Sequence, residues 1–232
     1  MGRGIIIAID GPAGSGKSTI AKMVALKFGY VYIDTGAMYR AITLKALWNN
    51  VLFDDNCALT SLAENTALIF RYETVGSDSK MYLWMDDIDV TVPIRSQEVT
   101  QNVSTVAAVP GVRAALVKSQ QKMAEHGGVV MDGRDIGTVV FPRAELKIFL
   151  SASVEERTQR RWLELREKGT PMDFEELRRQ IVTRDHYDSY REVDPLRQAE
   201  DACFLDTTAL SIEEVTAKVI ELAIQRGAKL KV

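Results

Sequence analysis

The sequence has 232 residues, a formal net charge of −3, and 46% hydrophobic and 26% charged residues. This composition is typical of a water-soluble globular protein with one large α/β domain and an insertion. The slightly negative charge excludes a broad polynucleotide-binding surface, because phosphate backbones require clustered positive charge. No apolar run approaches the length of a membrane span, so we expect no membrane association.

The N-terminal region and the cysteines favour a cytoplasmic location. The apolar stretch within Ile5–Asp10 is too short for a signal-peptide core, and no small-residue cleavage site follows it. Cys57 and Cys203 are the only cysteines and lie far apart in the sequence. We therefore expect no disulfide, and we expect both thiols to be buried as small hydrophobic groups in a reducing compartment.

Five short apolar runs are predicted as strands, and a loop or a helical stretch follows each of them. The alternation of strand and helix favours a parallel sheet covered on both faces. The predicted strands are Ile5–Asp10, Val31–Asp34, Val129–Asp132, Leu146–Leu150 and Cys203–Asp206.

Helix boundaries are indicated by capping residues and glycines. The N-cap and N3 spacing of a capping box occurs at Ser153 with Glu156, at Asp173 with Glu176, and at Ser211 with Glu214. Glycines that favour helix ends are Gly29, Gly127, Gly128 and Gly169.

The segment from about Leu68 to Pro93 breaks the alternation. Three short strand-like runs, Ile69–Glu73, Met81–Trp84 and Asp87–Val92, surround a turn cluster at Gly76–Ser79. We expect a small antiparallel insertion here. The alternative is a pair of edge strands on the main sheet.

A complete phosphate-binding motif lies between the first strand and the helical stretch Ser18–Phe28. The segment Gly11–Ser18 reads G-P-A-G-S-G-K-S and matches G-x-x-x-x-G-K-[ST], which occurs by chance in about one chain in a hundred of this length. Its backbone amides and the helix N-terminus attract phosphate. Lys17 is expected to reach the β- and γ-phosphates, and the Ser18 hydroxyl to hold Mg²⁺. The predicted ATP-binding residues are Gly11, Pro12, Ala13, Gly14, Ser15, Gly16, Lys17, Ser18 and Thr19.

The remaining motifs favour a small-molecule kinase among P-loop proteins. The N-K-x-D guanine reader of GTPases and the L-S-G-G-Q signature of ABC ATPases are both absent from the sequence. The second half of the chain instead carries arginines on predicted helices. A sensor or assembly protein that binds ATP without transferring phosphate is the alternative from another class.

Two groups of charged residues lie on these predicted helices, with Gly169–Pro171 between them as a possible lid tip. The groups are Arg157, Arg160 and Arg161, and Arg184, Asp188 and Arg191, the latter spaced i, i+4, i+7 on one helix face. A surface salt-bridge ladder would explain this pattern on an arbitrary helix. Beside a P-loop, the pattern favours phosphate ligands, because arginine presents a planar fork of donors and stays charged.

Two polar segments follow predicted strands, where open parallel sheets bind ligands. They read D-T-G-A-M-Y-R at Asp34–Arg40 and D-G-R-D-I-G-T-V-V-F-P at Asp132–Pro142. Together with the P-loop, with S-T-V-A-A-V-P-x-V-R at Ser104–Arg113 and with R-D-x-x-D-S-x-R at Arg184–Arg191, they make the chain resemble bacterial cytidylate kinases over nearly its whole length. The Asp132–Pro142 segment and the antiparallel insertion are specific to this family among nucleoside monophosphate kinases.

The resemblance implies a role for each matching residue. Arg40, Arg134 and Arg191 would bind the acceptor phosphate, while Arg184 and Asp188 would contact the ribose. Thr35, Ser104, Arg113 and Asp135 would surround the base, and many relatives have Ser in place of Thr35. Arg157 and Arg161 would be lid residues that reach the transferring phosphate. The catalytic set is then Lys17, Arg134, Arg157, Arg161 and Arg191.

The chemistry of cytosine agrees with this assignment. A carboxylate such as Asp135 accepts a hydrogen bond from the exocyclic amine of cytosine and repels the carbonyl that uracil carries there. We therefore expect transfer of the ATP γ-phosphoryl group to CMP or dCMP, with no general base, because the acceptor phosphate is mostly ionised near neutral pH. UMP, AMP or a small sugar acid is the alternative acceptor. For Asp135 the alternative is an N-cap or loop carboxylate.

The expected architecture is a three-layer P-loop NTPase fold with a five-stranded parallel sheet, a small antiparallel insertion and a helical lid. Residues 1–36, 94–152 and 192–232 would form the core, 37–93 the acceptor-binding region, and 153–191 the lid and the following helix. Ser18 would share Mg²⁺ with Asp132 or Asp34, either directly or through water. We expect a monomer, because no exposed apolar helix face stands out in the sequence.

Overall fold

The computed structural model describes residues 4–75, 78–167 and 169–231. The chain divides into two compact units, the first made of Met1–Ile33 with Met123–Val232 and the second of Asp34–Lys122. The division into core, acceptor-binding region and lid concerns roles in catalysis and stays a prediction.

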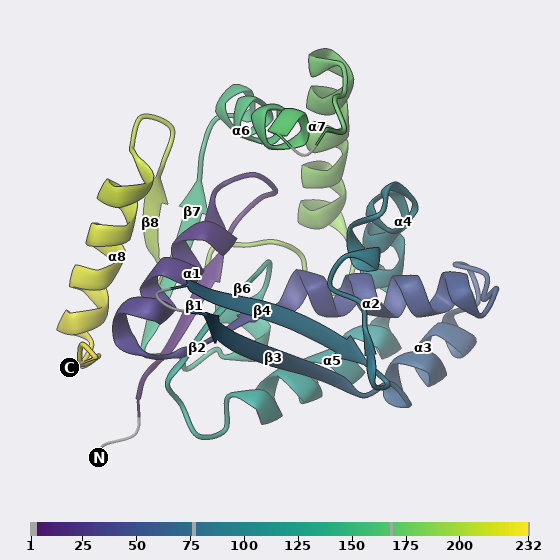
Figure 1. Ribbon diagram of the computed structural model, residues 1–232, viewed down its shortest axis with the longest axis horizontal. Helices are drawn as coiled ribbons and strands as arrows, with labels where there is room; N and C mark the ends of the chain where they lie inside the picture. The colour runs from purple at the N-terminus through teal and green to yellow at the C-terminus, as the bar shows by residue number, and fades with distance from the viewer. Residues whose placement is uncertain (1–3, 76–77, 168, 232) are drawn as a thin grey trace. The chain divides into compact units, whose positions relative to one another are not determined.

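A five-stranded sheet in the order β2-β6-β1-β7-β8 forms the centre of the first unit (Figure 1). β1 pairs in parallel with β6 and β7, and β7 pairs in parallel with β8. Ile7, Ala8 and Ile9 of β1 are all fully buried, so both faces of the strand are covered, which explains why it is apolar at successive positions. The strands are β1 (Ile6–Asp10), β2 (Val31–Asp34), β6 (Val129–Gly133), β7 (Leu146–Ser151) and β8 (Cys203–Asp206), so the five predicted strands are confirmed.

Helices of the first unit begin and end close to the predicted capping residues. They are α1 (Lys17–Phe28), α6 (Val154–Glu167), α7 (Phe174–Tyr190) and α8 (Ile212–Gln225), with one π-helical turn, η2 (Ile136–Val140). Ser211 and Glu214 form a reciprocal capping box at α8, and Asp173 accepts a hydrogen bond from the Glu176 amide at α7. Gly29 ends α1 with a φ of 67°, in the left-handed region that favours glycine.

The second unit contains helices and a separate antiparallel sheet in the order β3-β4-β5. The predicted insertion is therefore confirmed, and the alternative of edge strands on the main sheet is wrong. Its elements are α2 (Thr35–Trp48), α3 (Asn56–Glu64), β3 (Leu68–Val75), β4 (Asp78–Met85), β5 (Ile88–Asp89), η1 (Pro93–Arg95), α4 (Gln97–Ala108) and α5 (Pro110–Met123). The third strand is only two residues long, and it follows a turn in which Asp86 and Asp87 have positive φ. Gly76 and Ser77 of the predicted turn lie outside the described residues.

The prediction that both cysteines are buried is wrong. Cys57 is exposed and Cys203 is only partly buried, and both are free thiols, as expected. Cys57 lies in the first turn of α3, which buries Leu59 and Ala63 instead. A helix buries one stripe of its surface, and Cys57 lies outside that stripe.

An exposed apolar face is present on the first unit. Met23 and Leu26 of α1 and Ile220 of α8 line an open groove of about 550 Å³, where Leu26 is 60% exposed. The absence of such a face therefore cannot support a monomer, and the oligomeric state stays a prediction. No helix within residues 4–75, 78–167 and 169–231 is long and apolar enough to cross a membrane.

Candidate active site

The P-loop connects β1 to α1 and depends on three glycines. Gly11, Gly14 and Gly16 have φ values of 150°, 76° and 87°, which other residues rarely adopt. A Cβ on Gly11 would lie only 2.0 Å from the Leu150 carbonyl oxygen, so the loop begins in close contact with β7. The predicted motif thus has the required strand–loop–helix setting.

Lys17 is folded into the concavity of this loop. Its Nζ donates hydrogen bonds to the Pro12 carbonyl at 2.7 Å and to Ser15 Oγ at 3.3 Å, and the residue is 5% exposed. Burial, with a smaller effect of the Arg134 charge, lowers the pKa of Lys17 to about 7. A desolvated ammonium group gains most from a nearby anion, so a polyphosphate would restore its charge and bind tightly.

Ser18, Asp132 and Tyr32 form a chain of oxygen atoms beside the P-loop. Ser18 Oγ donates to Asp132 Oδ2 at 2.9 Å, and the Tyr32 hydroxyl donates to Asp132 Oδ1 at 2.7 Å. Asp34, the other predicted metal ligand, is instead the N-cap of α2, where its side chain accepts a hydrogen bond from the Ala37 amide. Among the described residues no group of three or more His, Cys, Asp or Glu side chains could hold a metal ion.

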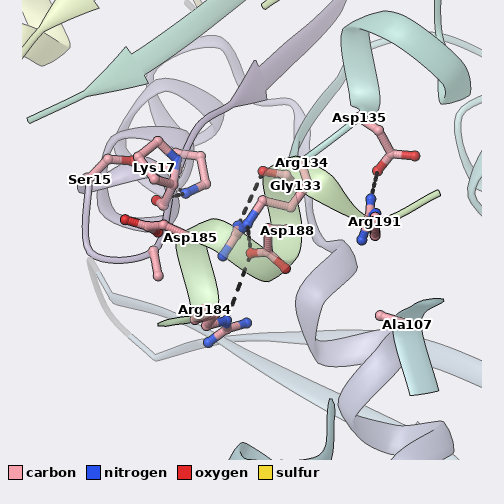
Figure 2. A network of polar contacts seen from close by, with 12 residues as sticks. Ser15, Lys17, Ala107, Gly133, Arg134, Asp135, Arg184, Asp185, Asp188 and Arg191 are labelled. Carbon is pink, nitrogen blue, oxygen red and sulfur yellow. Dashed lines mark hydrogen bonds and ion pairs between the residues drawn. The ribbon is translucent and has the colours of Figure 1, made fainter. Parts of the chain in front are cut away.

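A partly buried ion-pair network connects the residue after β6 to α7 (Figure 2). Arg134 Nε donates to Asp188 Oδ2 at 2.7 Å, and Arg184 Nε lies 3.9 Å from the same oxygen. The Nε of Arg184 is buried and has no hydrogen-bond partner within the part of the chain that the structure describes. Burial and the nearby Arg134 charge lower the pKa of Arg184 to about 10. Although burial opposes it, the charges of Arg134 and Arg184 hold the pKa of Asp188 below its ordinary value.

Arg191 lies just beyond α7, so the prediction that it shares a helix face with Arg184 and Asp188 is wrong. The helix ends at Tyr190, and Arg191 adopts φ −59° and ψ 146°, which is an extended conformation. Arg191 Nε donates to the Asp194 carbonyl at 2.9 Å, and its Nη2 lies 3.8 Å from Asp135 Oδ1 (Figure 2). Leaving the helix places Arg191 beside a second predicted site residue.

The three arginines of α6 have different partners. The buried Arg157 donates from Nη1 to the Ala13 carbonyl of the P-loop at 3.0 Å and pairs with Asp185 Oδ2 at 2.5 Å. Arg160 donates to Thr207 Oγ1 and to the Thr207 carbonyl oxygen. Arg161 pairs with Glu164 on the helix surface. Of these three arginines, Arg157 alone donates a hydrogen bond to the P-loop backbone within the described residues.

Four predicted acceptor residues, Thr35, Arg40, Ser104 and Arg113, lie in the second unit. Arg40 Nη1, on α2, donates to Thr100 Oγ1 at 2.8 Å. Arg113 is 2% exposed, donates to the Ala107 carbonyl at 3.1 Å and lies 5.5 Å from the centre of the Tyr39 ring. Thr35 is buried at the start of α2, and Ser104 is partly buried on α4.

Sequence reasoning missed three residues that contact the predicted site. Tyr32 contacts Asp132, Asp185 contacts Arg157, and Asp10 accepts hydrogen bonds from the amides that follow Asp135. For Asp10 one signal exists in the sequence, since a carboxylate ends an otherwise apolar strand directly before the P-loop. Tyr32 and Asp185 make contacts 100 and 28 residues away, which no local pattern indicates.

Comparison with known proteins identifies the family of the chain. The family model described as Cytidylate kinase matches residues 7–225. A cytidylate kinase from Streptococcus pneumoniae serotype 19F (strain G54) is 53% identical over 215 residues, which cover 93% of this chain and 95% of the relative. One from Streptococcus sanguinis (strain SK36) is 53% identical over 219 residues, covering 94% and 96%. A solved shikimate kinase from Acinetobacter baumannii aligns with 97% of this chain and 96% of its own length, at 16% identity and a TM-score of 0.46. The chain belongs to the cytidylate kinase family.

Proposed function

We propose that this protein transfers the γ-phosphoryl group of ATP to CMP or dCMP, producing ADP and CDP or dCDP. Membership of the cytidylate kinase family supports this reaction. The observation that carries it is the position of Arg134 and Asp135 directly after β6, which pairs with β1, the strand that leads into the P-loop. Arg134, proposed to bind phosphate, and Asp135, proposed to contact the base, thus follow β6. This strand lies next to β1, which leads into the ATP-binding loop.

On the ATP side, Lys17 would bind the β- and γ-phosphates and stabilise the charge of the transferring group. Ser18 and Asp132 fit a magnesium ion, because both offer the hard oxygen atoms that Mg²⁺ prefers and lie 2.9 Å apart. Asp132 is favoured over Asp34, whose carboxylate caps α2. When bound, Mg²⁺ would neutralise charge on the phosphates.

On the acceptor side, Arg40, Arg134 and Arg191 would bind the CMP phosphate, and Arg184 with Asp188 the ribose. The underpartnered Nε of Arg184 supports a role as a ligand donor. Thr35, Ser104, Arg113 and Asp135 would surround the base, on the strength of the family resemblance. Arg157 and Arg161 would act on the transferring phosphate, and the hydrogen bond from Arg157 to the P-loop supports this for Arg157.

The proposed step is an in-line displacement at the γ-phosphorus of ATP. An oxygen of the CMP phosphate forms the new bond, and the bond to the β,γ-bridging oxygen breaks, so ADP carries away the electron pair. The acceptor oxygen is already ionised near pH 7, since its second pKa is about 6. The protein therefore needs to supply orientation and positive charge rather than a base. We also propose a cytoplasmic location, which two free thiols support.

The first test measures kcat/KM with ATP and each of CMP, dCMP, UMP, AMP and GMP. We expect CMP or dCMP to exceed UMP by roughly tenfold or more, because an unpaired polar group in the base site costs about 1–3 kcal/mol. Faster turnover with AMP or UMP would show that the acceptor is assigned wrongly. ATP binding with no acceptor-dependent turnover would favour the sensor alternative.

Replacing Asp135 by Asn should reduce the preference for CMP over UMP by about tenfold or more. The carboxylate only accepts hydrogen bonds, whereas the amide can also donate one to the uracil carbonyl. The measurement is the ratio of kcat/KM for the two nucleotides, in which any general loss from the broken Arg191 contact cancels. Asp55→Asn is the matched control, because Asp55 is an exposed N-cap of α3 and Asn caps equally well. An unchanged ratio would remove Asp135 from the base site.

A further inference from the structure

The carboxylate of Asp10 is a buried group to which the proposed reaction assigns no role. Asp10 is the last residue of β1 and is only 5% exposed. Its Oδ1 accepts a hydrogen bond from the Ile136 amide at 2.8 Å, and its Oδ2 accepts one from the Gly137 amide at 2.7 Å. Both oxygens are thus occupied by consecutive backbone N–H groups, from residues more than 120 positions away in the sequence.

Asp10 contacts the chain on both sides of the short segment Arg134–Asp135. Before this segment, Gly133 is the register partner of Asp10 in the pairing of β1 with β6. After it, the Ile136 and Gly137 amides are bound by the Asp10 side chain. Arg134 and Asp135, the two residues proposed to bind CMP, therefore lie between two positions that are both held by Asp10.

The π-helical turn η2 has little room to move away from this carboxylate. A Cβ on Gly137 would lie 3.1 Å from Lys147 Cδ and 3.3 Å from Asp10 Oδ2, which is closer than most real contacts. Lys147 is itself fixed, since its Nζ donates to the Pro142 carbonyl at 2.6 Å and to Asp201 Oδ1 at 2.8 Å. Gly137 therefore lies between Asp10 and an anchored side chain.

A carboxylate is the side chain that fits these two amides, although its burial is costly. Burial raises the pKa of Asp10 to about 7, against the opposing effects of the two amide hydrogen bonds and of Lys17. An Asn here would offer one acceptor oxygen, and its NH₂ group would face the second amide donor. An apolar residue would leave two buried amides unsatisfied.

We propose that Asp10 is a positioning residue that fixes Arg134 and Asp135 for the acceptor nucleotide and does not itself touch substrate. The proposal rests on the proposed function for the identity of that nucleotide. Asp10 directly precedes Gly11, so it connects the strand that leads into the ATP loop with the loop that carries the acceptor ligands. Its loss should therefore weaken acceptor binding selectively, leaving the ATP loop, which is formed by its own backbone, largely intact.

The first experiment compares Asp10→Asn with wild type in steady-state kinetics, with Asp55→Asn as the matched carboxylate-to-amide control. We expect the KM for CMP to rise roughly tenfold or more, since small misplacements of binding groups have effects of this size. The KM for ATP should stay within about threefold of wild type, and CMP should lose part of its advantage over UMP. An equal rise in both KM values, or unchanged kinetics, would overturn the proposal.

Amide hydrogen exchange of the ligand-free protein gives a second readout that needs no substrate. We expect protection of at least one of the Ile136 and Gly137 amides to fall about tenfold or more in Asp10→Asn, because Asn keeps only one acceptor oxygen, with the amides of β6 and α1 unchanged. Retained protection at both amides would also overturn the proposal. If wild type prefers an acceptor other than CMP, the proposed function fails, and the KM comparison is then made with the preferred acceptor.

Gly137→Ala tests the same positioning role by changing the turn instead of the carboxylate. It can be used even if Asp10→Asn does not fold. The added Cβ would push against Asp10 Oδ2 and Lys147 Cδ, displacing the turn without removing any charge. We expect the same separation of effects, with a raised KM for CMP and a nearly unchanged KM for ATP. A variant that folds and binds CMP like wild type would contradict the positioning role.

Discussion

Replacing Lys17 by Ala should lower kcat by about 10³-fold, which corresponds to about 4 kcal/mol of transition-state stabilisation. Charge moves along the β- and γ-phosphates during transfer, and Lys17 is the cation of the P-loop itself. The fold should survive, because the Nζ is desolvated and burial already lowers its pKa to about 7. Turnover is measured with saturating ATP and CMP, and folding by circular dichroism and thermal unfolding.

Lys27→Ala is the control for this substitution. Lys27 lies on the same helix, α1, but is exposed in its last turn and has no proposed role in the reaction. It should keep wild-type kcat. Turnover of Lys17→Ala near that of the control would contradict the phosphoryl-transfer mechanism, even if ATP still bound.

Much of this site could be predicted because its signals are local. Eight consecutive residues determine the P-loop, since Gly11, Gly14 and Gly16 are needed for positive φ and Lys17 follows them directly. The five strands were predictable for a similar reason. A buried parallel strand is apolar on both faces, so it appears as a short continuous run.

The errors arise where tertiary contacts decide the structure. Periodicity places Arg191 on α7, but the chain leaves the helix at Tyr190 and its guanidinium binds the Asp194 carbonyl oxygen. A helical pattern does not show where the last turn ends when no glycine or proline marks it. Free cysteines are often buried, which predicts a buried position for Cys57, but α3 buries a different face.

Asp10 shows a further limit of reading the sequence alone. The residue belongs to a predicted strand, yet its importance comes from two amides more than 120 residues later. The phosphate-binding pattern begins only at Gly11, so it does not include Asp10. The same applies to Asp185, whose contact with Arg157 joins α7 to α6.

Replacing Asp188 by Asn should lower the free energy of unfolding by about 3 kcal/mol, in the range measured when one partner of a buried ion pair is removed. Asp188 is the buried anion shared by Arg134 and Arg184, and without it two partly buried like charges would face each other. Arg134 already lowers the pKa of Arg184, which shows the direction of that repulsion. Urea unfolding at pH 7 measures the loss, and the KM for CMP should also rise if both arginines bind the acceptor.

The pH dependence separates this charge effect from a packing effect. Arg134 and Arg184 lower the pKa of Asp188 in the folded protein, so the carboxylate stabilises the fold at pH values above its ordinary value of 3.8. That contribution is lost as the pH falls through 3.8 towards the lower folded pKa. The difference between wild type and Asp188→Asn should therefore be full at pH 7 and shrink at more acid pH, whereas Asp55→Asn should match wild type at pH 7. A difference in the free energy of unfolding that stayed constant from pH 7 to acid pH would show that the amide disturbs packing. The charge of the shared carboxylate would then not be what holds Arg134 and Arg184 together.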